Sequence, residues 1–295
     1  MNTKELHYFV STAEQGGVRA AARALGVPQP AITRAIQSLE RQLKVALLVR
    51  RSDGMTLSAE GKRFLTRARL ITNEAQKAAE EIQQTKASYV GAVHAVLSIM
   101  PHLHLFPTAI RTFTATYPKV KLHIREALLP AVVNDLRSGE VDFYMGAISP
   151  QAREPDIKIT ELMANSRIVV GRREHPLRYA SSLDALTTEQ WAVTDLDHDA
   201  SAELQTLFQR NGLPPPEVSV YGKTTMSILM ALTNTNLLAM LPEQWAANPI
   251  TRDLLAVFPI SEKLPAPPIG MAVSSRLPLT PPAEHFSDLL RRGIR

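Results

Sequence analysis

Few side chains in this sequence have the types and spacing that catalysis or metal binding requires. His102 and His104 stand two residues apart, with His94 nearby, but the same segment offers no carboxylate that would complete a metal site. There is no cysteine, which excludes disulfides, thiolate zinc sites and cysteine nucleophiles. The glycine-flanked serine of a nucleophile elbow and the glycine-rich loops that hold nucleotides are missing too. We therefore expect no catalytic residue, no metal and no cofactor.

A second set of side chains suits the recognition of nucleic acid. Gln29, Pro30, Thr33 and Arg34 lie within six residues of one another. Gln can pair with adenine through two hydrogen bonds, Arg can do the same with guanine, and Thr offers a hydroxyl or a methyl group to a base edge. The same residues would also suit the solvated face of an ordinary helical bundle, so the interpretation depends on the elements that carry them.

The surrounding sequence predicts two short helices joined by a tight turn. An apolar stripe over residues 6–13 ends at Gly16-Gly17, and a helix-forming run over residues 18–25 ends at Gly26. Pro28 then favours a turn, after which one apolar face of a third helix is formed by Ile32, Ile36, Leu39 and Leu43. In a helix-turn-helix, the second helix of the pair enters the major groove with its N-terminal residues at the base edges. Here those residues are the four named above.

A hairpin is expected directly after the helix pair. Residues 47–57 are typical of two short strands around the turn Ser52-Asp53-Gly54. Arg50 and Arg51 stand where they would reach phosphates or the adjoining minor groove, although two arginines on a hairpin can also be plain surface charge. Beside the helix pair, the hairpin is interpreted as the wing of a DNA-binding domain.

A long helix with a heptad repeat follows the hairpin, with Ser58, Gly61 and Lys62 at its start. The apolar positions, spaced by four and three residues, are Leu57, Gly61, Phe64, Ala68, Ile71, Ala75, Ala78 and Ile82. Sustained over about three to four heptads, this pattern predicts a coiled coil and hence a homodimer with two recognition helices. A long helix packed along the core of its own chain would show the same spacing.

Composition and charge agree with a polyanion-binding end joined to a different body. The chain has 295 residues, of which 45% are hydrophobic and 21% charged, as in ordinary globular proteins of about two domains. Residues 1–90 carry 14 Lys and Arg against 8 Asp and Glu, whereas residues 91–295 carry 19 against 20. No apolar run is long enough to cross a membrane and the N-terminus has no export pattern, so we expect a cytoplasmic protein.

The sequence resembles the LysR-type transcriptional regulators over essentially its whole length. The matching positions are Leu6-x-Tyr8-Phe9, Ala20-Ala21, Leu25-Gly26-Val27, Gln29-Pro30-Ala31-Ile32-Thr33-Arg34-x-Ile36-x-x-Leu39-Glu40, Leu43, Leu47-Leu48-x-Arg50 and Leu57-Ser58-x-x-Gly61. The resemblance implies that Gln29, Pro30, Thr33, Arg34, Arg50 and Arg51 face promoter DNA. It also implies a homodimer, usually assembled as a homotetramer (dimer of dimers).

The fold class that the resemblance implies is α/β, with an N-terminal winged helix-turn-helix, a long linker helix and an effector domain resembling periplasmic binding proteins. We expect the DNA-binding domain at 1–58, the linker helix at 59–90 and the effector domain at 91–295. Within the last, the resemblance implies subdomain I at 91–162 with 267–295, and subdomain II at 163–266. The proline-rich residues 264–268 suit a crossover strand between them.

Two positions depart from the family pattern. Pro28 stands where the family commonly has a serine, and proline cannot supply the hydroxyl that caps a helix. Proline is nevertheless tolerated at a helix start, so the helix should survive while a cap or phosphate contact is lost. Val18-Arg19 also replaces a small polar and aromatic pair, which suggests an unusual operator preference.

After Gly91, short apolar runs alternate with helical patterns, which predicts a parallel-rich α/β sheet. Strands are expected at 93–98, 120–126, 141–146, 167–171, 190–194, 217–221 and 237–241. Helices are expected at 104–116, 130–138, 200–211 and 224–234.

An effector site is expected in the cleft between the two subdomains, at the carboxyl ends of the strands. From the segments 98–100, 128–130, 145–147, 195–201 and 222–226, the candidate residues are Ser98, Ile99, Met100, Leu129, Met145, Gly146, Ala147, Ser201, Thr224 and Thr225. Ser98 and Thr224 or Thr225 stand at expected helix N-termini, where hydroxyls and backbone N–H groups suit a carboxylate, although each hydroxyl could simply cap its own helix.

The apolar lining of Leu, Met, Ile and Pro favours a small, partly apolar anion such as an aromatic carboxylate, with Lys223 either adding a charge or facing solvent. We interpret the chain as a regulator that binds promoter DNA and turns over nothing. An α/β enzyme or a solute-binding protein would use the same cleft and is the alternative.

Overall fold

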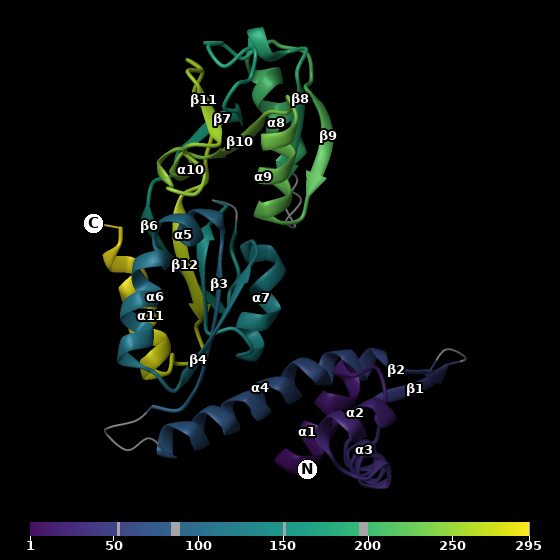
Figure 1. Ribbon diagram of the computed structural model, residues 1–295. Helices are drawn as coiled ribbons and strands as arrows, with labels where there is room; N and C mark the ends of the chain where they lie inside the picture. Colours follow the sequence, from purple (N-terminus) through teal and green to yellow (C-terminus); the bar gives the residue numbers. More distant parts are fainter. Residues whose placement is uncertain (52–53, 84–88, 150–151, 195–199, 295) are drawn as a thin grey trace.

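The computed structural model describes residues 1–51, 54–83, 89–149, 152–194 and 200–294. Figure 1 shows a small N-terminal domain, a long helix that leads away from it, and an α/β body in two lobes at the other end. Within the described ranges, no helix is long and apolar enough to cross a membrane.

The N-terminal domain is a winged helix-turn-helix, as the sequence predicted. Its elements are α1 (Thr3–Glu14), α2 (Val18–Leu25), α3 (Gln29–Leu43), β1 (Leu48–Arg51) and β2 (Gly54–Leu57). A capping box between Asn2 and Glu5 starts α1. Gly26 adopts the left-handed conformation (φ 64°) that ends α2, because glycine has no side chain to oppose it. Phe9, Ile32 and Leu39 are fully buried beneath the helices.

The long helix α4 (Ala59–Gln83) is packed against this domain over its first half. The Ser58 hydroxyl accepts the Gly61 N–H at 2.8 Å and so caps the helix start. Phe64 contacts Phe9 with ring centroids 5.5 Å apart, and Ala68 is fully buried in the same core.

The heptad repeat expected along α4 is therefore divided between two environments. Gly61, Phe64 and Ala68 are used by the core of their own chain, which is the alternative that the sequence left open. Beyond them the same stripe is exposed, with Ile71 41% and Ile82 87% accessible. Only this second half of the repeat is available to another helix.

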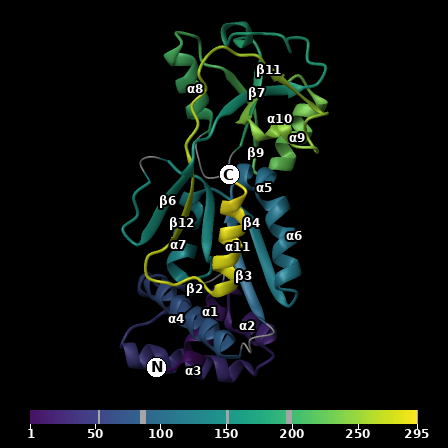
Figure 2. The ribbon, with the colours of Figure 1, turned by 90° about the vertical axis from the view of Figure 1, so that its left-hand side faces the viewer.

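Subdomain I is a five-stranded sheet of order β4-β3-β5-β12-β6. Its elements are β3 (Gly91–Leu97), α5 (Ile99–His104), α6 (Phe106–Thr116), β4 (Val120–Glu126), α7 (Leu129–Ser138), β5 (Phe143–Ala147), β6 (Ile157–Met163), β12 (Ile269–Ser274) and α11 (Pro281–Arg292). Helices α6 and α11 cover one face of the sheet and α7 covers the other (Figures 1 and 2). Figure 2 shows this subdomain between the N-terminal domain and subdomain II.

Subdomain II has two small sheets, of order β10-β7-β11 and β8-β9, joined by a bridge between Trp191 and Leu238. Its elements are β7 (Arg167–Arg172), the 3-10 turn Asp184–Leu186, β8 (Gln190–Thr194), α8 (Ala200–Arg210), β9 (Glu217–Gly222), α9 (Thr225–Asn234), β10 (Ala239–Pro242), α10 (Gln244–Ala247) and β11 (Leu255–Phe258). Trp191 and Trp245 are buried in its two hydrophobic clusters.

Every strand and helix expected after Gly91 is present, and no end is shifted by more than two residues. The strand directions, however, are more mixed than predicted. β3 pairs parallel with β4 and β5, whereas β12 pairs antiparallel with β5 and β6, and β7 pairs antiparallel with β10 and β11. The reason lies in the two crossings between subdomains. Because β6 leads toward subdomain II and β12 leads back, these two strands must run in opposite directions.

Several elements were not predicted, namely α5, β6, α10, β11, β12 and α11. The proline-rich residues 264–268, expected as a crossover strand, form no strand and lead into β12 at Ile269. Prolines lack the N–H that a strand ladder needs, whereas Pro281 and Pro282 are accommodated in the first turn of α11, where N–H groups have no partner within the helix.

Candidate nucleic-acid interface and effector cleft

The start of α3 presents the side chains expected to face DNA. Helix α3 begins at Gln29, after Pro28 in an extended conformation, and no side chain caps it. Gln29, Pro30 and Arg34 are exposed, and Arg34 forms no ion pair with any described residue. Thr33 is partly exposed, and its hydroxyl donates to the Gln29 carbonyl at 3.2 Å, so its proton already has an acceptor.

The wing is held to α3 by Glu40, to which sequence analysis assigned no role beyond matching the family pattern. One carboxylate oxygen of Glu40 accepts the N–H groups of Leu47 and Leu48, at 2.8 and 3.1 Å. These bonds fix the start of β1 relative to the recognition helix. The backbone of Arg50 and Arg51 belongs to β1, opposite Met55 and Gly54, but their side chains lie outside the described part of the chain.

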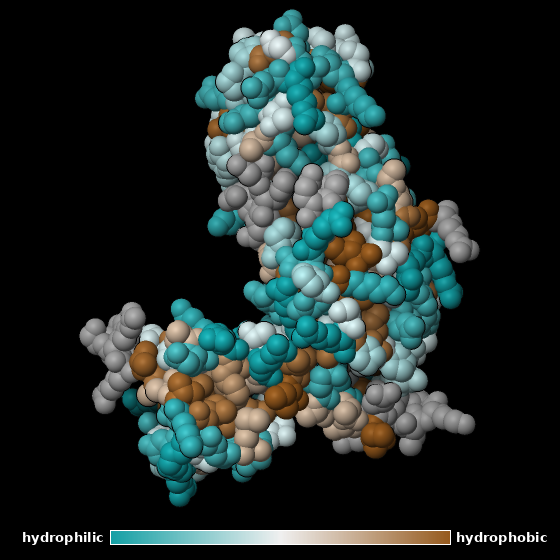
Figure 3. Space-filling model, turned by 180° about the vertical axis from the view of Figure 1, so that it is seen from behind, coloured by the Kyte–Doolittle hydropathy of each residue, from teal (hydrophilic) through white to brown (hydrophobic). Residues whose placement is uncertain are grey.

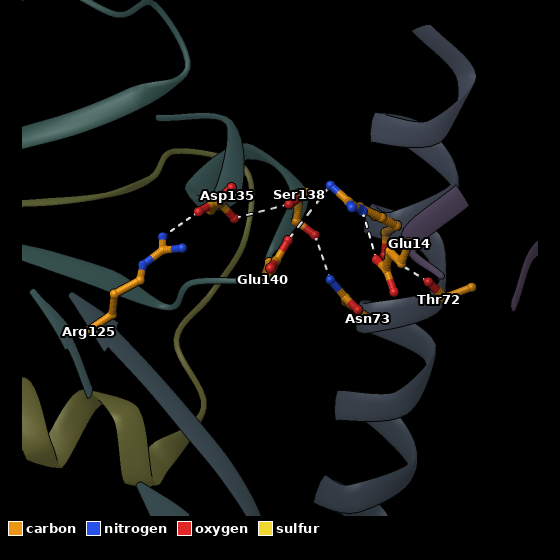
Figure 4. Close-up of polar contacts among 8 residues, drawn as sticks. Glu14, Thr72, Asn73, Arg125, Asp135, Ser138 and Glu140 are labelled. Atoms are coloured by element: carbon orange, nitrogen blue, oxygen red, sulfur yellow. Dashed lines mark hydrogen bonds and ion pairs between the residues drawn. The ribbon is translucent and has the colours of Figure 1, made fainter. Parts of the chain in front are cut away.

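Helix α4 is joined to subdomain I by polar contacts that sequence reasoning missed (Figure 4). Asn73 donates to the Ser138 carbonyl at 3.0 Å. Arg69 lies 3.0 Å from Glu14 of α1 and 3.8 Å from Glu140, which follows α7. One arginine of the linker helix therefore contacts both the DNA-binding domain and the effector domain.

A buried ion pair also connects α4 to subdomain I. Lys77 of α4 lies 2.6 Å from one carboxylate oxygen of Asp142, whose side chain is 1% exposed. The other carboxylate oxygen of Asp142 accepts the backbone N–H of His94 at 2.8 Å. Because both oxygens of this carboxylate are engaged, Asp142 ties the linker helix to strand β3.

The imidazole of His94 stacks on that of His123 in this joint, with centroids 4.4 Å apart and planes 5° from parallel. The two residues are directly opposite each other on the parallel strands β3 and β4. Burial lowers the pKa of His94 below its ordinary value, the nearby His123 lowers it further, and Asp142 opposes both effects.

On the subdomain I side of the cleft, the structure brings Ser98, Gly146 and Ala147 together. Ser98 is 3% exposed, and its hydroxyl accepts the Ala147 N–H at 3.2 Å rather than capping α5. Tyr144 donates its phenol to the Ala147 carbonyl at 2.8 Å. A Cβ on Gly146 would lie 2.4 Å from the Ser98 hydroxyl, so only glycine fits there.

Other candidate residues on this side are core residues. Met100, Leu129 and Met145 are at most 2% exposed, and Leu129 and Met145 belong to the two clusters that cover the sheet faces. Ile99 is only partly buried and packs against the cluster of subdomain II that contains Trp245. Ile99 therefore contacts the opposite subdomain.

On the subdomain II side, Thr224 and Thr225 behave differently. The Thr224 hydroxyl accepts the Ser227 N–H at 3.1 Å and thus caps α9. Thr225 instead donates its hydroxyl to the Glu126 carboxylate at the end of β4, across the two subdomains. Ser201 lies in the first turn of α8, and residues 195–199, expected beside it, lie outside the described ranges.

Charged groups lie close to the candidate effector residues Thr225 and Ser201, where sequence reasoning expected few charges. Besides Glu126, Arg167 lies 2.6 Å from Glu203 of α8 with its side chain 15% exposed. His102 is near Glu126, and burial lowers the pKa of its imidazole while Glu126 opposes that effect. Glu126 was expected to end one strand and Arg167 to begin another, and this was the only sequence signal that pointed to either residue. Among the residues that the structure covers, no three His, Asp or Glu side chains form a metal-binding group.

Comparison with known proteins agrees with this architecture. Residues 3–62 match the bacterial regulatory helix-turn-helix protein family of lysR type, and residues 91–295 match the LysR substrate binding domain. The regulator TdcA of Escherichia coli K12 is 26% identical over 263 residues, covering 89% of this chain and 84% of TdcA. TfdT of Cupriavidus pinatubonensis is 35% identical over 150 residues, covering 51% of this chain and 66% of TfdT.

Solved structures show the same fold over the full length. Full-length OxyR C199D of Pseudomonas aeruginosa has a TM-score of 0.71 at 21% identity, covering 100% of this chain and 95% of OxyR. CbnR in complex with its target DNA has a TM-score of 0.69 at 24% identity, covering 99% of this chain and all of CbnR. With a matching helix-turn-helix and a matching substrate-binding domain on one chain, this protein belongs to the LysR family of DNA-binding transcriptional regulators.

Proposed function

We propose that this regulator reads promoter DNA with the first turns of α3 and responds to a small partly apolar anion between its two subdomains. It acts as a homodimer, assembled further as a dimer of dimers, and it catalyses no reaction. The division expected from the sequence, with the linker helix separating residues 1–58 from 91–295, is part of this proposal.

The proposed DNA interface rests on the exposure of Arg34 and Gln29 and on the lack of an ion pair at Arg34 among the described residues. Both are exposed in the first two turns of α3, and Arg34 has no carboxylate partner among the described residues. A guanidinium without an ion pair at this end of a recognition helix is available for two hydrogen bonds to guanine. Arg50 and Arg51 of the wing are proposed to contact the sugar-phosphate backbone.

The DNA interface is tested by selecting binding sites for the full-length protein from a library of random duplexes. On a selected site, we expect Arg34→Ala to weaken binding by about 1–3 kcal/mol, which is the discrimination that a bidentate base contact provides. Arg41→Ala, an exposed arginine in the last turn of the same helix, is the matched control. Equal loss in the two variants, measured by fluorescence anisotropy at one salt concentration, would contradict the proposed orientation of α3.

The contact between Thr225 and Glu126 supports an anionic effector. In this contact the Thr225 hydroxyl, in the first turn of α9, donates to a carboxylate, which is the group that the proposed effector carries. Ser98, Ala147 and Ile99 stand on the other side, which gives one polar end and one apolar wall. An effector such as an aromatic carboxylate would replace Glu126 as the partner of Thr225.

Thermal unfolding of the full-length protein with benzoate and salicylate tests this effector class, because a ligand that binds only the folded state raises the unfolding temperature. Thr225→Val is expected to lose the stabilisation. Thr233→Val, at the opposite end of α9, should keep it, since its hydroxyl donates to the Leu229 carbonyl within the helix. Stabilisation that persists in Thr225→Val would contradict this site. Release of a product from any of these compounds would favour the enzyme alternative.

A further inference from the structure

A cavity of about 610 Å³ lies between the start of the linker helix and the effector domain, at a place that the proposed function does not use. One wall is apolar and comes from the end of α3, the approach to β1 and the first turns of α4. It contains Leu43, Val45, Leu47, Phe64 and Leu70. The opposite wall belongs to subdomain I and contains Arg137, Asp156, Ser274 and Arg276. No candidate residue of the effector cleft lines this cavity.

The charges around the cavity are unbalanced. Four arginines line it against two carboxylates, Glu60 and Asp156. On the subdomain I side, Arg137 and Arg276 both approach Asp156, at 3.3 and 3.9 Å. On the α4 side, Arg63 and Arg67 form no ion pair with any residue in the described ranges. These two stand one helical turn apart, where like charges repel each other.

We propose that this cavity binds an amphipathic anion, meaning a carboxylate or sulfonate on an aromatic or medium-length aliphatic body. The apolar wall covers the body, and Arg63 and Arg67 bind the acidic group. The cavity volume falls within the range of about 300–1,000 Å³ that small-molecule sites occupy, and apolar walls with a few converging polar groups are typical of such sites. Figure 3 shows apolar side chains gathered over the N-terminal domain and continuing toward the base of the effector domain.

The location gives such a ligand a defined effect. Its site is built from the DNA-binding domain and linker helix on one side and from subdomain I on the other. A molecule that contacts both walls stabilises the arrangement in which they face each other, and it does so independently of the cleft. The linker joint made by Lys77 and Asp142 lies on the same helix, so the ligand and this ion pair favour the same arrangement.

The test uses the full-length protein and two probes of one shape. The anionic probe is 8-anilinonaphthalene-1-sulfonate, whose fluorescence rises on binding, and N-phenyl-1-naphthylamine is its uncharged counterpart. We expect the anionic probe to bind with one site per chain and about tenfold more tightly than the neutral one, as a charge-assisted contact provides. Equal affinity of the two probes, or no binding to the folded protein, overturns the proposal.

Two variants locate the site. Arg63→Gln with Arg67→Gln should weaken the anionic probe about tenfold and leave the neutral probe unchanged. The control pair, Arg111→Gln with Arg210→Gln, changes two exposed arginines that do not line the cavity. Thr66→Trp fills the cavity from α4 and should abolish binding of both probes without removing a charge. Unchanged affinity in both cavity variants overturns the proposal, whereas Thr225→Val should leave probe binding intact and so separates this site from the cleft.

Discussion

At the scale of single residues, Gly61 shows how closely the linker helix approaches the wing. A Cβ at this position would lie 2.0 Å from the Leu47 carbonyl oxygen and 2.9 Å from its carbon. Both are backbone atoms, and that oxygen also accepts the Ser58 N–H at 3.0 Å, so it cannot move without breaking the start of α4. The glycine is needed for space and not for an unusual backbone angle.

We predict that Gly61→Ala destabilises the folded protein by roughly 1–3 kcal/mol, as overpacking does, even though alanine favours a helix by about 1 kcal/mol. The measurement is urea unfolding followed by circular dichroism. Gly17→Ser is the control, because nothing lies within 4 Å of its Cβ and serine is favoured before α2. Equal stability of the two variants would show that α4 can separate from the wing without cost.

At the scale of elements, the exposed half of the α4 stripe is the surface that we propose for dimerisation. Ile71, Ala75, Ala78 and Ile82 are exposed on one face, while the side of α4 that carries Asn73 and Lys77 contacts subdomain I. A narrow stripe with alanines lets two helices approach closely. A second copy of α4 is the partner whose repeat matches it.

We predict that Ala78→Glu converts the protein from a dimer to a monomer, because a symmetric pair of helices would bury two carboxylates at the seam. Ala79→Glu introduces the same charge one residue away from the seam, on an alanine that is also exposed, and should leave the dimer intact. Sedimentation velocity over a concentration series measures both. A wild-type protein that is monomeric throughout, or two variants that behave alike, would rule out this seam.

At the scale of the whole molecule, the contacts between α4 and subdomain I connect the DNA-binding domain to the effector domain. The groups that meet at His94 are His123, Asp142, Lys77 and Glu80. Burial keeps the pKa of His94 below the value of 6.5 that it has when exposed. Between these two pKa values, the unfolded chain binds a proton that the folded chain does not, so stability rises with pH in this window.

We therefore predict that the free energy of unfolding falls as the pH is lowered from about 7.5 to about 5.5, and that His94→Gln reduces this fall. His102, whose pKa burial also lowers, accounts for part of what remains. Urea unfolding at several pH values gives the slopes, and an unchanged slope in His94→Gln would contradict the assignment.

Local signals in the sequence were sufficient for most of the helices and strands. The end of α2 at Gly26, the start of α3 after Pro28 and the apolar face from Ile32 to Leu43 depend on residues within a few positions of one another. That is why helix α3 could be predicted from the sequence. The contact of its exposed residues Gln29, Pro30 and Arg34 with DNA stays a prediction. The predicted turn residues Ser52 and Asp53 lie outside the described ranges. The strands from β3 to β10 followed from short apolar runs in the same way, although their directions did not.

Only the tertiary structure decided which side chains meet across long stretches of chain. The sequence alone could not divide the α4 repeat between its own core and a free seam, because the same spacing serves both. It could not pair Lys77 with Asp142, or Thr225 with Glu126, since these partners are 65 and 99 residues apart. Nor could it show that Met145 and Leu129 lie in the core, because apolar residues at a strand's end or a helix's start suit a cleft wall and a core equally well.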